Sequence, residues 1–497
     1  MRCHRLLKSD FPASVFQFFN GYLYGITRKE FFHQFRPFYE TESTTIEIVF
    51  ISHIVYFAEL FDLVKIDSPS RKEAGVAHYC QHVLEDLGFT VCFDASNEQT
   101  GSETGNLVAW LAPKGVVATE AASENSPLLN GFESAPIVLT AHMDCVQPCG
   151  GVEPEVVKDS TLSDKGLLVR SKGETVLGSD DKAGVASILE AARCIVESGA
   201  PHKGIVIVFT VCEEIGCLGA KYLDQELFDY ALAQVRKTTS ERSTEGSVDS
   251  SSANSSSTSS AASSSTSSEK AQSKGIVPCA VFDSDGAAGT IIVGAPYHYT
   301  FVAEITGRAS HAGVEPEAGI SAISIASDAL ARISWGRLDE ATTSNIGRIE
   351  GGQVNNIVAQ SCSVTGECRS LSRDRVEEVR TEITSAFEAA FEKFSPSNKE
   401  NKAPFEAFIP ENSQAKLDLE WTLEYSGFFY EESDKLIQFL SNAAKKAGLK
   451  PIYKTTGGGS DANVLASKGA TPVVVGVGMT NFHTIDEYVL VEDLENS

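Results

Sequence analysis

The sequence predicts an α/β protein in which a mixed sheet with flanking helices is interrupted by an inserted α+β sandwich. Between residues 55 and 296, short apolar runs alternate with segments of helical spacing, which is typical of a layered α/β sheet. Residues 297–427 follow the order strand, helix, strand, strand, helix, strand of a ferredoxin-like sandwich. The alternation of apolar runs and helical segments resumes in residues 428–497, so the sandwich is predicted to be inserted into the larger domain.

The elements are bounded by residues that break helices and strands. Helical spacing in 57–65 ends before Pro69, and Ser70 is placed to cap a helix over 73–87 that stops at Gly88. The larger domain is further predicted to contain strands at 89–93, 106–111, 137–141, 204–211, 277–282, 451–454 and 472–476, and helices at 183–198, 219–235 and 433–447. The inserted domain is predicted to contain strands at 297–306, 345–349, 361–368 and 417–425, and helices at 318–333 and 373–394.

Two segments stand apart from this pattern. Residues 1–54 form an N-terminal extension without an assigned role, basic and rich in Phe at its start. It lacks the Ser-rich, Arg-rich amphipathic form of most targeting peptides, and organelle targeting stays open as an alternative. Residues 236–274 are rich in Ser, with Thr, Ala and Glu, and cannot bury enough apolar surface to offset the entropy of ordering. They are predicted to be a disordered insertion in a surface loop, with a phosphorylated regulatory segment as the alternative.

Composition excludes several classes of protein. A net charge of −26 argues against a nucleic-acid partner, which needs clustered Lys and Arg. No run of about 18 uncharged apolar residues is present, so neither a membrane span nor a membrane partner is expected. The 11 cysteines form no CxxC pair and no secretory signal is evident, which predicts reduced thiols in the cytoplasm. Cys145 and Cys149 flank the first candidate site residue, and small buried residues are their simpler interpretation.

Metal-ligand side chains follow two of the predicted elements. His142 and Asp144 end an apolar strand and, as alternate residues, point to the same side, so His142 can bind a metal while Asp144 orients its ring. Asp180 and Asp181 are adjacent like charges in a glycine-bounded turn, which is favourable mainly beside a cation. One such carboxylate can bridge two metals. Each pattern also has an ordinary explanation, a structural histidine or acidic residues at a helix N-terminus.

Later strand ends add further candidates. Glu213 and Glu214 end a buried strand, where one can bind a metal and the other can take a proton from water on the metal. Asp283 ends another apolar strand, with Asp285 as a rival ligand. His483 follows a strand and a glycine-rich turn near the C-terminus. A histidine near each end of the larger domain, with carboxylates between them, is what a pair of zinc ions needs.

From about residue 55 onwards, a series of motifs in order resembles the peptidase T-like branch of the zinc aminopeptidase, aminoacylase and carboxypeptidase superfamily: HMD, GSDDKAG, TVCEEIGCLGA, VFDSDGAAGTI, GRASHAG, GGQVNNIVA, GECRSLSRD, GGGSDAN and NFHTIDE. The resemblance implies a zinc-exopeptidase-type catalytic domain and two zinc ions per subunit. It also implies that the inserted domain is a lid through which two subunits form a homodimer.

The resemblance assigns roles to the catalytic-domain residues. The implied metal ligands are His142 and Asp283 for one ion, Glu214 and His483 for the other, and Asp180 between them. Glu213 is the implied general base, and Asp144 orients His142. In this family the peptide bond after the bridging Asp180 is often cis. The family usually finishes with a longer helix than this chain, which stops at Ser497 soon after His483.

The inserted domain supplies the implied substrate contacts. His311 of a neighbouring subunit stabilises the oxyanion, and Arg369 holds the terminal carboxylate of the substrate. The implied cleft residues are Asn356, with Asn355 as the alternative, and Gly459 and Ser460. Taken singly, each has a plainer interpretation as a surface histidine, an exposed arginine or a turn.

The resemblance implies hydrolysis of short peptides by a tripeptide aminopeptidase-like exopeptidase, with Glu213 as the base. An aminoacylase- or carboxypeptidase-type amidohydrolase, with the same metals and a different pocket, is the alternative. A non-catalytic binding or scaffold protein that retains the fold is a third hypothesis, and the complete ligand set together with Glu213 argues against it. The expected partners are therefore a short peptide and a second copy of the chain.

Overall fold

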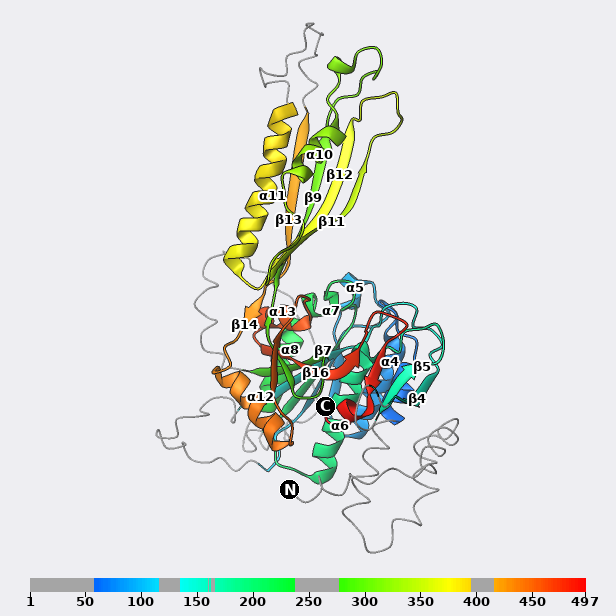
Figure 1. Cartoon of the computed structure of the whole chain (residues 1–497). Helices are drawn as coiled ribbons and strands as arrows, with labels where there is room; N and C mark the ends of the chain where they lie inside the picture. Colours follow the sequence, from blue (N-terminus) through cyan, green and yellow to red (C-terminus); the bar gives the residue numbers. More distant parts are fainter. Residues whose placement is uncertain (1–57, 116–134, 160, 162–165, 237–276, 395–414) are drawn as a thin grey trace, which may run out of the picture. The chain divides into compact units, whose positions relative to one another are not determined.

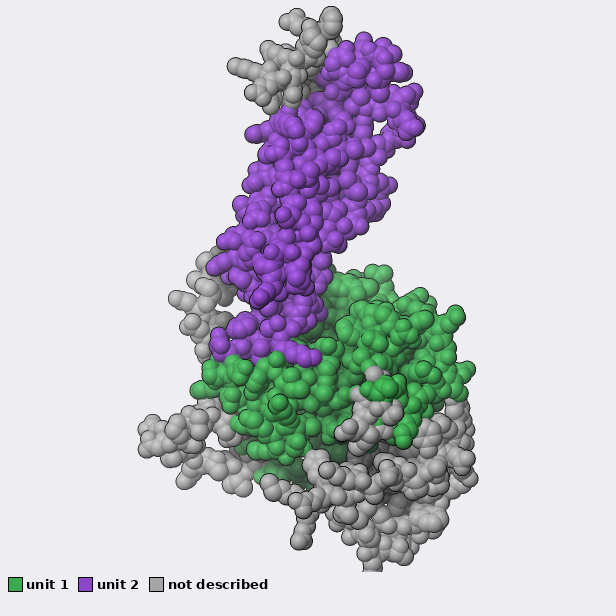
Figure 2. Space-filling model, in the orientation of Figure 1, with its two compact units in different colours: residues 1–292, 432–453, 460–497 green, residues 293–431, 454–459 purple. Residues whose placement is uncertain are grey.

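The computed structural model describes residues 58–115, 135–159, 161, 166–236, 277–394 and 415–497, and it divides into two compact units (Figure 2). Unit 1 comprises residues 1–292, 432–453 and 460–497, and unit 2 comprises residues 293–431 and 454–459. Segment Lys454–Gly459 thus groups with unit 2, although the sequence assigns all of 428–497 to the larger domain. The predicted extension at 1–54, and all of the predicted Ser-rich insertion after Arg236, lie outside the described residues.

Unit 1 is built on a mixed sheet whose central strands are parallel (Figure 1). Strands β6 (Ile205–Thr210), β3 (Ile137–His142), β7 (Pro278–Asp285) and β16 (Thr471–Thr480) lie side by side in that order and run in the same direction. Every residue of β6 is buried, as expected for a parallel strand covered on both faces. Because parallel strands end at the same edge of a sheet, the last residues of β3 and β7 are delivered to one place.

Further strands extend this sheet on both sides. One side continues through β2 (Leu107–Leu111) and β1 (Thr90–Phe93), and the other through β17 (Tyr488–Leu490), β5 (Leu167–Ser171) and β4 (Pro154–Lys158). Strand β8 (Thr290–Ala295) pairs with β16, with β14 (Phe428–Phe429) and with β15 (Ile452–Thr455). The sequence analysis does not predict β4, β5, β8, β14 or β17. Strands β4 and β5 carry charged side chains and β14 and β17 are very short, whereas β8 is a buried apolar strand that the sequence analysis missed.

Helix α6 (Ser179–Ser198) packs on the central strands and positions the site. Its residues Ile188 and Leu189 share a buried core with Phe209 of β6. The helix comes close to β7 at Gly184, where a β-carbon would lie 2.1 Å from the carbonyl oxygen of Phe282, so only glycine fits. Among the described residues of unit 1, further helices include α4 (Ala74–Asp86), α5 (Asn97–Thr100), α7 (Leu218–Lys221), α8 (Gln225–Arg236), α12 (Lys435–Lys446), α13 (Asp461–Leu465), the 3₁₀ helix η6 (Ala466–Lys468) and α14 (Val491–Leu494).

Unit 2 contains an antiparallel sheet covered by two helices (Figure 1). Its strand order is β10 (Gly336–Asp339), β11 (Thr342–Gly351), β12 (Ser361–Ser370), β9 (Tyr297–Thr306) and β13 (Lys416–Tyr425). Helices α10 (Ala322–Ala331) and α11 (Arg373–Phe394) place Ile325 and Ile383 in one core with Phe301 and Val364. The predicted α/β fold with a ferredoxin-like second sheet is confirmed, with β10 as an additional strand and η4 (Pro316–Ala318) as an additional 3₁₀ helix.

Two local predictions are wrong. The predicted helix over 219–235 is divided into α7 and α8, because the Asp224 side chain accepts hydrogen bonds from the backbone N–H groups of Glu226 and Leu227 and starts a new helix. Ser70 does not cap α4, since Glu73 occupies the N-cap and the Ser70 hydroxyl donates to Asp144 instead, at 2.6 Å. In the described part of the chain no helix has the length and apolar character needed to cross a membrane.

Candidate metal centre

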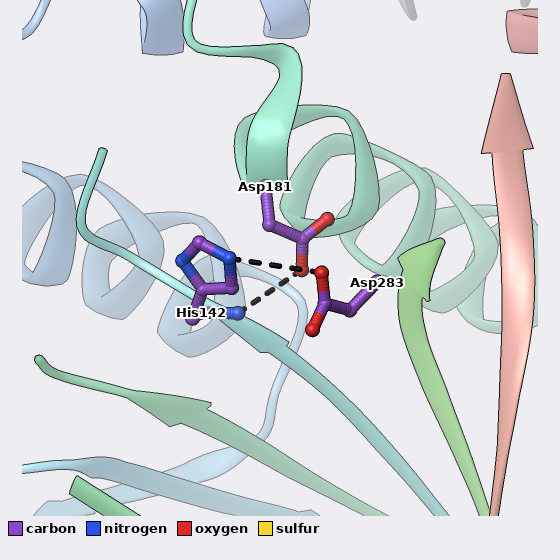
Figure 3. Close-up of side chains that lie close together, drawn as sticks. All are labelled: His142, Asp181 and Asp283. Carbon is purple, nitrogen blue, oxygen red and sulfur yellow. Dashed lines mark hydrogen bonds and ion pairs between the residues drawn. The ribbon is translucent and has the colours of Figure 1, made fainter. Parts of the chain in front are cut away.

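The predicted metal ligands of unit 1 meet at the edge where its central strands end. They come from the end of β3, the start of α6, the turn after β6, the end of β7 and the loop after β16: His142, Asp180, Glu214, Asp283 and His483. Figure 3 shows His142, Asp181 and Asp283 pointing toward one another from three different elements. Since these residues are far apart in the sequence, their meeting is produced by the fold.

His142 is buried, and both of its ring nitrogens have partners. Nε2 lies 3.0 Å from Oδ1 of Asp180 and 3.7 Å from Oδ1 of Asp283. Nδ1 lies 3.0 Å from the backbone oxygen of Asp144 and 3.4 Å from its Oδ1. Asp144 therefore fixes the ring so that Nε2 faces the carboxylates, which is how an orienting residue acts on a metal-binding histidine.

Asp180 lies between the two histidines. Its Oδ1 is 3.0 Å from His142 Nε2, and its Oδ2 is 3.2 Å from His483 Nε2. The residue sits in a non-helical turn at the start of α6, and its peptide bond to Asp181 is cis, as the family resemblance implies. A carboxylate whose two oxygens face two different imidazoles has the placement of a bridging ligand.

His483 and Glu214 form the other side of the centre. His483 Nε2 lies 2.9 Å from Oε2 and 3.1 Å from Oε1 of Glu214. Two overlapping groups of ligand atoms each fall within 4.8 Å: His142 with Asp180 and Glu214, and His142 with Asp181 and Asp283. The described residues thus offer two neighbouring groups of candidate ligands, which overlap at His142 and at the Asp180–Asp181 turn.

The turn after β6 carries both glutamates. The backbone N–H groups of Gly216 and Cys217 donate to the Glu213 carbonyl at 2.9 and 2.7 Å, which closes the turn. The Asp144 carboxylate accepts from the backbone N–H of Glu213 at 2.9 Å and from that of Glu214 at 3.3 Å. The residue that orients His142 therefore also holds the glutamate turn against the centre.

The carboxylates are crowded and buried. Burial and the charges of neighbouring acids raise the pKa of Asp283 and of Asp181 well above the usual range. Burial, with the charges of Asp461 and Glu214, raises the pKa of Glu213 to about 8. Burial would also raise the pKa of Asp180, but its hydrogen bonds with His142 and His483 outweigh burial and lower that pKa.

Burial acts on the pKa values of the histidines in the opposite direction, but their hydrogen bonds to the acids outweigh it. Burial alone would lower the pKa of His142, yet its hydrogen bonds to Asp144 and Asp180 raise that pKa well above the usual value. Hydrogen bonds to Asp180 and Glu214 raise the pKa of His483 to about 10. Protons on the histidines thus partly offset the clustered acids. Divalent cations bound by the same nitrogen and oxygen atoms would do so more completely, and this donor set fits zinc.

The structure shows the contacts of three acids whose roles the sequence alone does not determine. Asp283 faces His142, whereas Asp285 lies at the exposed end of β7, where the Ser284 hydroxyl approaches it at 3.3 Å. Asp181 accepts from the backbone N–H of His142 at 3.1 Å and from that of Gly184 at 3.2 Å. Asp181 therefore ties the start of α6 to the end of β3, besides being a candidate ligand.

Glu487 is a buried acid that sequence reasoning missed. Its Oε1 accepts from the Ser179 hydroxyl at 2.6 Å and from the Asp180 N–H at 3.0 Å, and its Oε2 accepts from the Gly178 N–H at 2.8 Å. Because it follows His483 in the same loop, it joins that loop to the turn that carries Asp180. The available signal was its place within NFHTIDE, but an acid in a polar turn has no distinguishing local pattern.

Arg369, a predicted substrate contact, is held within unit 2. Its Nη2 donates to Glu367 Oε2 at 3.0 Å, and its Nη1 lies 3.4 Å from both the Tyr425 hydroxyl and the Gly457 carbonyl. Hydrogen bonds from His298 and Arg369 outweigh partial burial and lower the pKa of Glu367 to about 2. The ionised Glu367 carboxylate therefore holds the Arg369 guanidinium in place.

The other predicted substrate residues are divided between the units. His311, Asn356 and Gly459 belong to unit 2, where His311 and Asn356 are exposed. The Asn356 carbonyl accepts from the N–H of Ala312 at 2.9 Å, so the two predicted side chains lie on adjoining segments. Ser460 belongs to unit 1, where its hydroxyl caps α13.

Comparisons with known proteins bear on this arrangement. The profile of peptidase family M20/M25/M40 matches residues 138–497. Protein YqjE of Bacillus subtilis is 34% identical over 440 residues, which cover 88% of this chain and 93% of that protein. The crystal structure of aminopeptidase PepT from Bacillus cereus aligns with a TM-score of 0.66 and 31% identity, over 89% of this chain and 95% of that one. That of a tripeptidase from Staphylococcus aureus aligns with a TM-score of 0.67 and 27% identity over the same shares.

Replacing Glu487 by Gln is expected to weaken zinc binding by about 10–100-fold, the usual cost of losing an outer hydrogen-bond partner of a metal site. The amide would turn an NH₂ group toward donors that now meet a carboxylate oxygen. Competition with a chromophoric chelator measures the affinity. Asp486→Asn is the matched control, because Asp486 is an exposed carboxylate in the same loop. Equal affinities of both variants would remove the positioning role of Glu487.

Proposed function

The chain belongs to peptidase family M20/M25/M40, and from that premise we propose that it is a zinc-dependent exopeptidase that removes the N-terminal residue from short peptides, tripeptides first. The observation that carries the proposal is the Asp180 carboxylate placed between His142 and His483, with Glu213 and Glu214 on the adjoining turn. The similarity to an aminopeptidase and to a tripeptidase supports the choice of substrate class.

Two ions would be held by the residues already described. In this proposal His142 and Asp283 would hold one ion, Glu214 and His483 would hold the other, and Asp180 would contribute to both. Bound zinc supplies Lewis acidity and a lowered pKa for water. Asp144 keeps His142 Nε2 directed at the centre, and Glu487 keeps the Asp180 turn in place.

Glu213 is proposed as the general base. Without bound cations, burial and neighbouring acids raise the pKa of Glu213 to about 8, and the positive charge of bound zinc would favour its ionised form, which is the form that accepts a proton. It takes a proton from the attacking water and passes it to the leaving amine, which returns the carboxylate to its starting state. Its turn is fixed by Asp144, so the carboxylate is held ready before the substrate binds.

Unit 2 is proposed to recognise the substrate and to mediate dimerisation. Arg369 presents a planar guanidinium, supported by Glu367, that suits the terminal carboxylate of a peptide. His311 of a second subunit donates to the oxyanion, which requires a homodimer. The exposed apolar side chains of unit 2 support such an interface; they are Val302, Val314, Ile323, Ile349, Val354, Ile357, Leu423 and Phe429.

Glu213→Gln is expected to keep its zinc and lose activity by about 10²–10⁴-fold, because only the proton carrier is removed. Activity on a tripeptide and zinc content are measured on the same preparation. Glu214→Gln serves as the comparison, since losing a ligand should reduce zinc content as well. A Glu213→Gln protein that retained wild-type activity would show that another group is the base.

Substrate class is tested by offering the zinc-loaded protein a tripeptide, the same tripeptide with a C-terminal amide, and N-acyl amino acids. Cleavage of the tripeptide at its first peptide bond is expected, with a higher KM for the amide because Arg369 loses its carboxylate partner. Turnover of the N-acyl amino acids alone would establish the aminoacylase- or carboxypeptidase-type alternative. No turnover by a protein that binds zinc would favour the scaffold hypothesis.

The contribution of His311 across the dimer is tested by co-expressing Glu213→Gln chains with His311→Ala chains. Each variant alone is expected to be nearly inactive. Mixed dimers contain an intact site, built from Glu213 of one chain and His311 of the other, so about a quarter of wild-type activity should return in a symmetric dimer. Light scattering measures the dimer itself. No recovery in a preparation shown to contain mixed dimers would place His311 outside the partner's site.

A further inference from the structure

A second cluster of ligand-type side chains adjoins the metal centre in unit 1. It consists of Glu213, Cys217 and Asp461, each of which offers one donor atom within 4.8 Å of the other two. Cys217 Sγ lies 3.1 Å from Glu213 Oε1. Cys217 and Asp461 are 3% and 2% exposed, so two of the three side chains of the cluster are buried.

Asp461 has an unsatisfied atom in this cluster. Its Oδ2 accepts a hydrogen bond from the Thr210 hydroxyl, whereas its Oδ1 has no hydrogen-bond partner among the described residues. Buried carboxylate oxygens are normally paired, because desolvating one without a partner is unfavourable. A free oxygen beside a thiol and a second carboxylate is the arrangement that a cation completes.

The cluster is also fixed in advance of binding. The Cys217 N–H donates to the Glu213 carbonyl at 2.7 Å, so one short turn sets the spacing of these two donors. Asp461 is the first residue of α13, whose start is held by the reciprocal capping of Ser460 and Asn463. Neither Cys217 nor Asp461 is a ligand of the two proposed zinc ions. Glu213 is proposed as the general base and not as a ligand.

We propose that Glu213, Cys217 and Asp461 form an additional site for a thiophilic divalent cation such as Zn²⁺ or Cd²⁺, and that occupation of this site inhibits the enzyme. One sulfur and two carboxylate oxygens are ligands that zinc accepts, with a fourth position left for water. On binding, the Cys217 S–H bond breaks, its proton goes to solvent, and the sulfur electron pair forms the bond to the metal.

Inhibition follows because the metal occupies the carboxylate that must otherwise carry the proton. This consequence rests on the proposed role of Glu213, whereas the binding itself does not. The ions of the centre repel another cation, so this site is expected to fill only after the pair, when zinc is in excess. The predicted behaviour is activation by the first zinc added and inhibition by more.

The test titrates zinc-loaded protein with Cd²⁺ and with additional Zn²⁺. Wild type is expected to show an ultraviolet thiolate-to-cadmium charge-transfer band and to bind a further ion in equilibrium dialysis, with tripeptide cleavage falling in parallel. Cys217→Ala should lose the band, and it should need more than about tenfold higher zinc for half-inhibition relative to its own activity without added zinc. Cys80→Ala, which removes a buried thiol of the main core, is the control and should behave as wild type.

Cys217→Ser and Asp461→Asn extend the test where the alanine variant folds poorly, and the band and the dialysis need no activity. A band that persists without Cys217, or inhibition unchanged in all three variants, would overturn the site. A further ion bound through Cys217 in a protein that cleaves no peptide would keep the site and refute the proposed function. Ion binding through Cys217 without inhibition of an active enzyme would overturn the inhibitory role.

Discussion

The sharing of one carboxylate between two imidazoles is the interaction on which the rest of the centre depends. Asp180 reaches His142 with one oxygen and His483 with the other, and it does so from a turn buried under the sheet edge. Each further acid brought to this edge adds a charge that burial makes costly. The fold therefore concentrates acidic groups where protons or bound cations must balance their charge, and it places candidate ligands for divalent metal ions together at this edge.

Two buried acids stabilise the segments that carry the other acids of the centre. Asp144 accepts from the backbone of the glutamate turn while it orients His142, and Glu487 accepts three hydrogen bonds from the turn around Asp180. These residues fix the strand-end loops that a parallel sheet leaves irregular. Positions of the ligands are thus set by backbone N–H donors, and the imidazole and carboxylate atoms that face the centre stay available for metal.

Much of the fold and of the candidate site could be predicted from the sequence, and what could not be predicted has a physical reason. Apolar strands and their polar ends are local patterns, so His142 and Asp283 could be placed at strand ends, and the inserted sandwich could be predicted from its order of elements. The identity of partners is not local. The sequence around Ser70 does not indicate that its side chain contacts Asp144, and the sequence around Glu487 does not indicate that it contacts the Asp180 turn. Both contacts join segments that are distant in the chain.

The same geometry places the proposed general base, Glu213, next to further groups that could bind a metal ion. A turn tight enough to present Glu213 and Glu214 side by side also brings Cys217 back over the Glu213 carboxylate. The buried start of α13 supplies Asp461, one oxygen of which has no hydrogen-bond partner among the described residues. Glu213 is then flanked by a thiol, which a soft cation prefers, and by a second carboxylate. Under this proposal, the high proton affinity of Glu213 and the affinity of the additional site for a metal ion have one cause, the crowding of anionic groups around a desolvated carboxylate, so a change that weakens one should weaken the other.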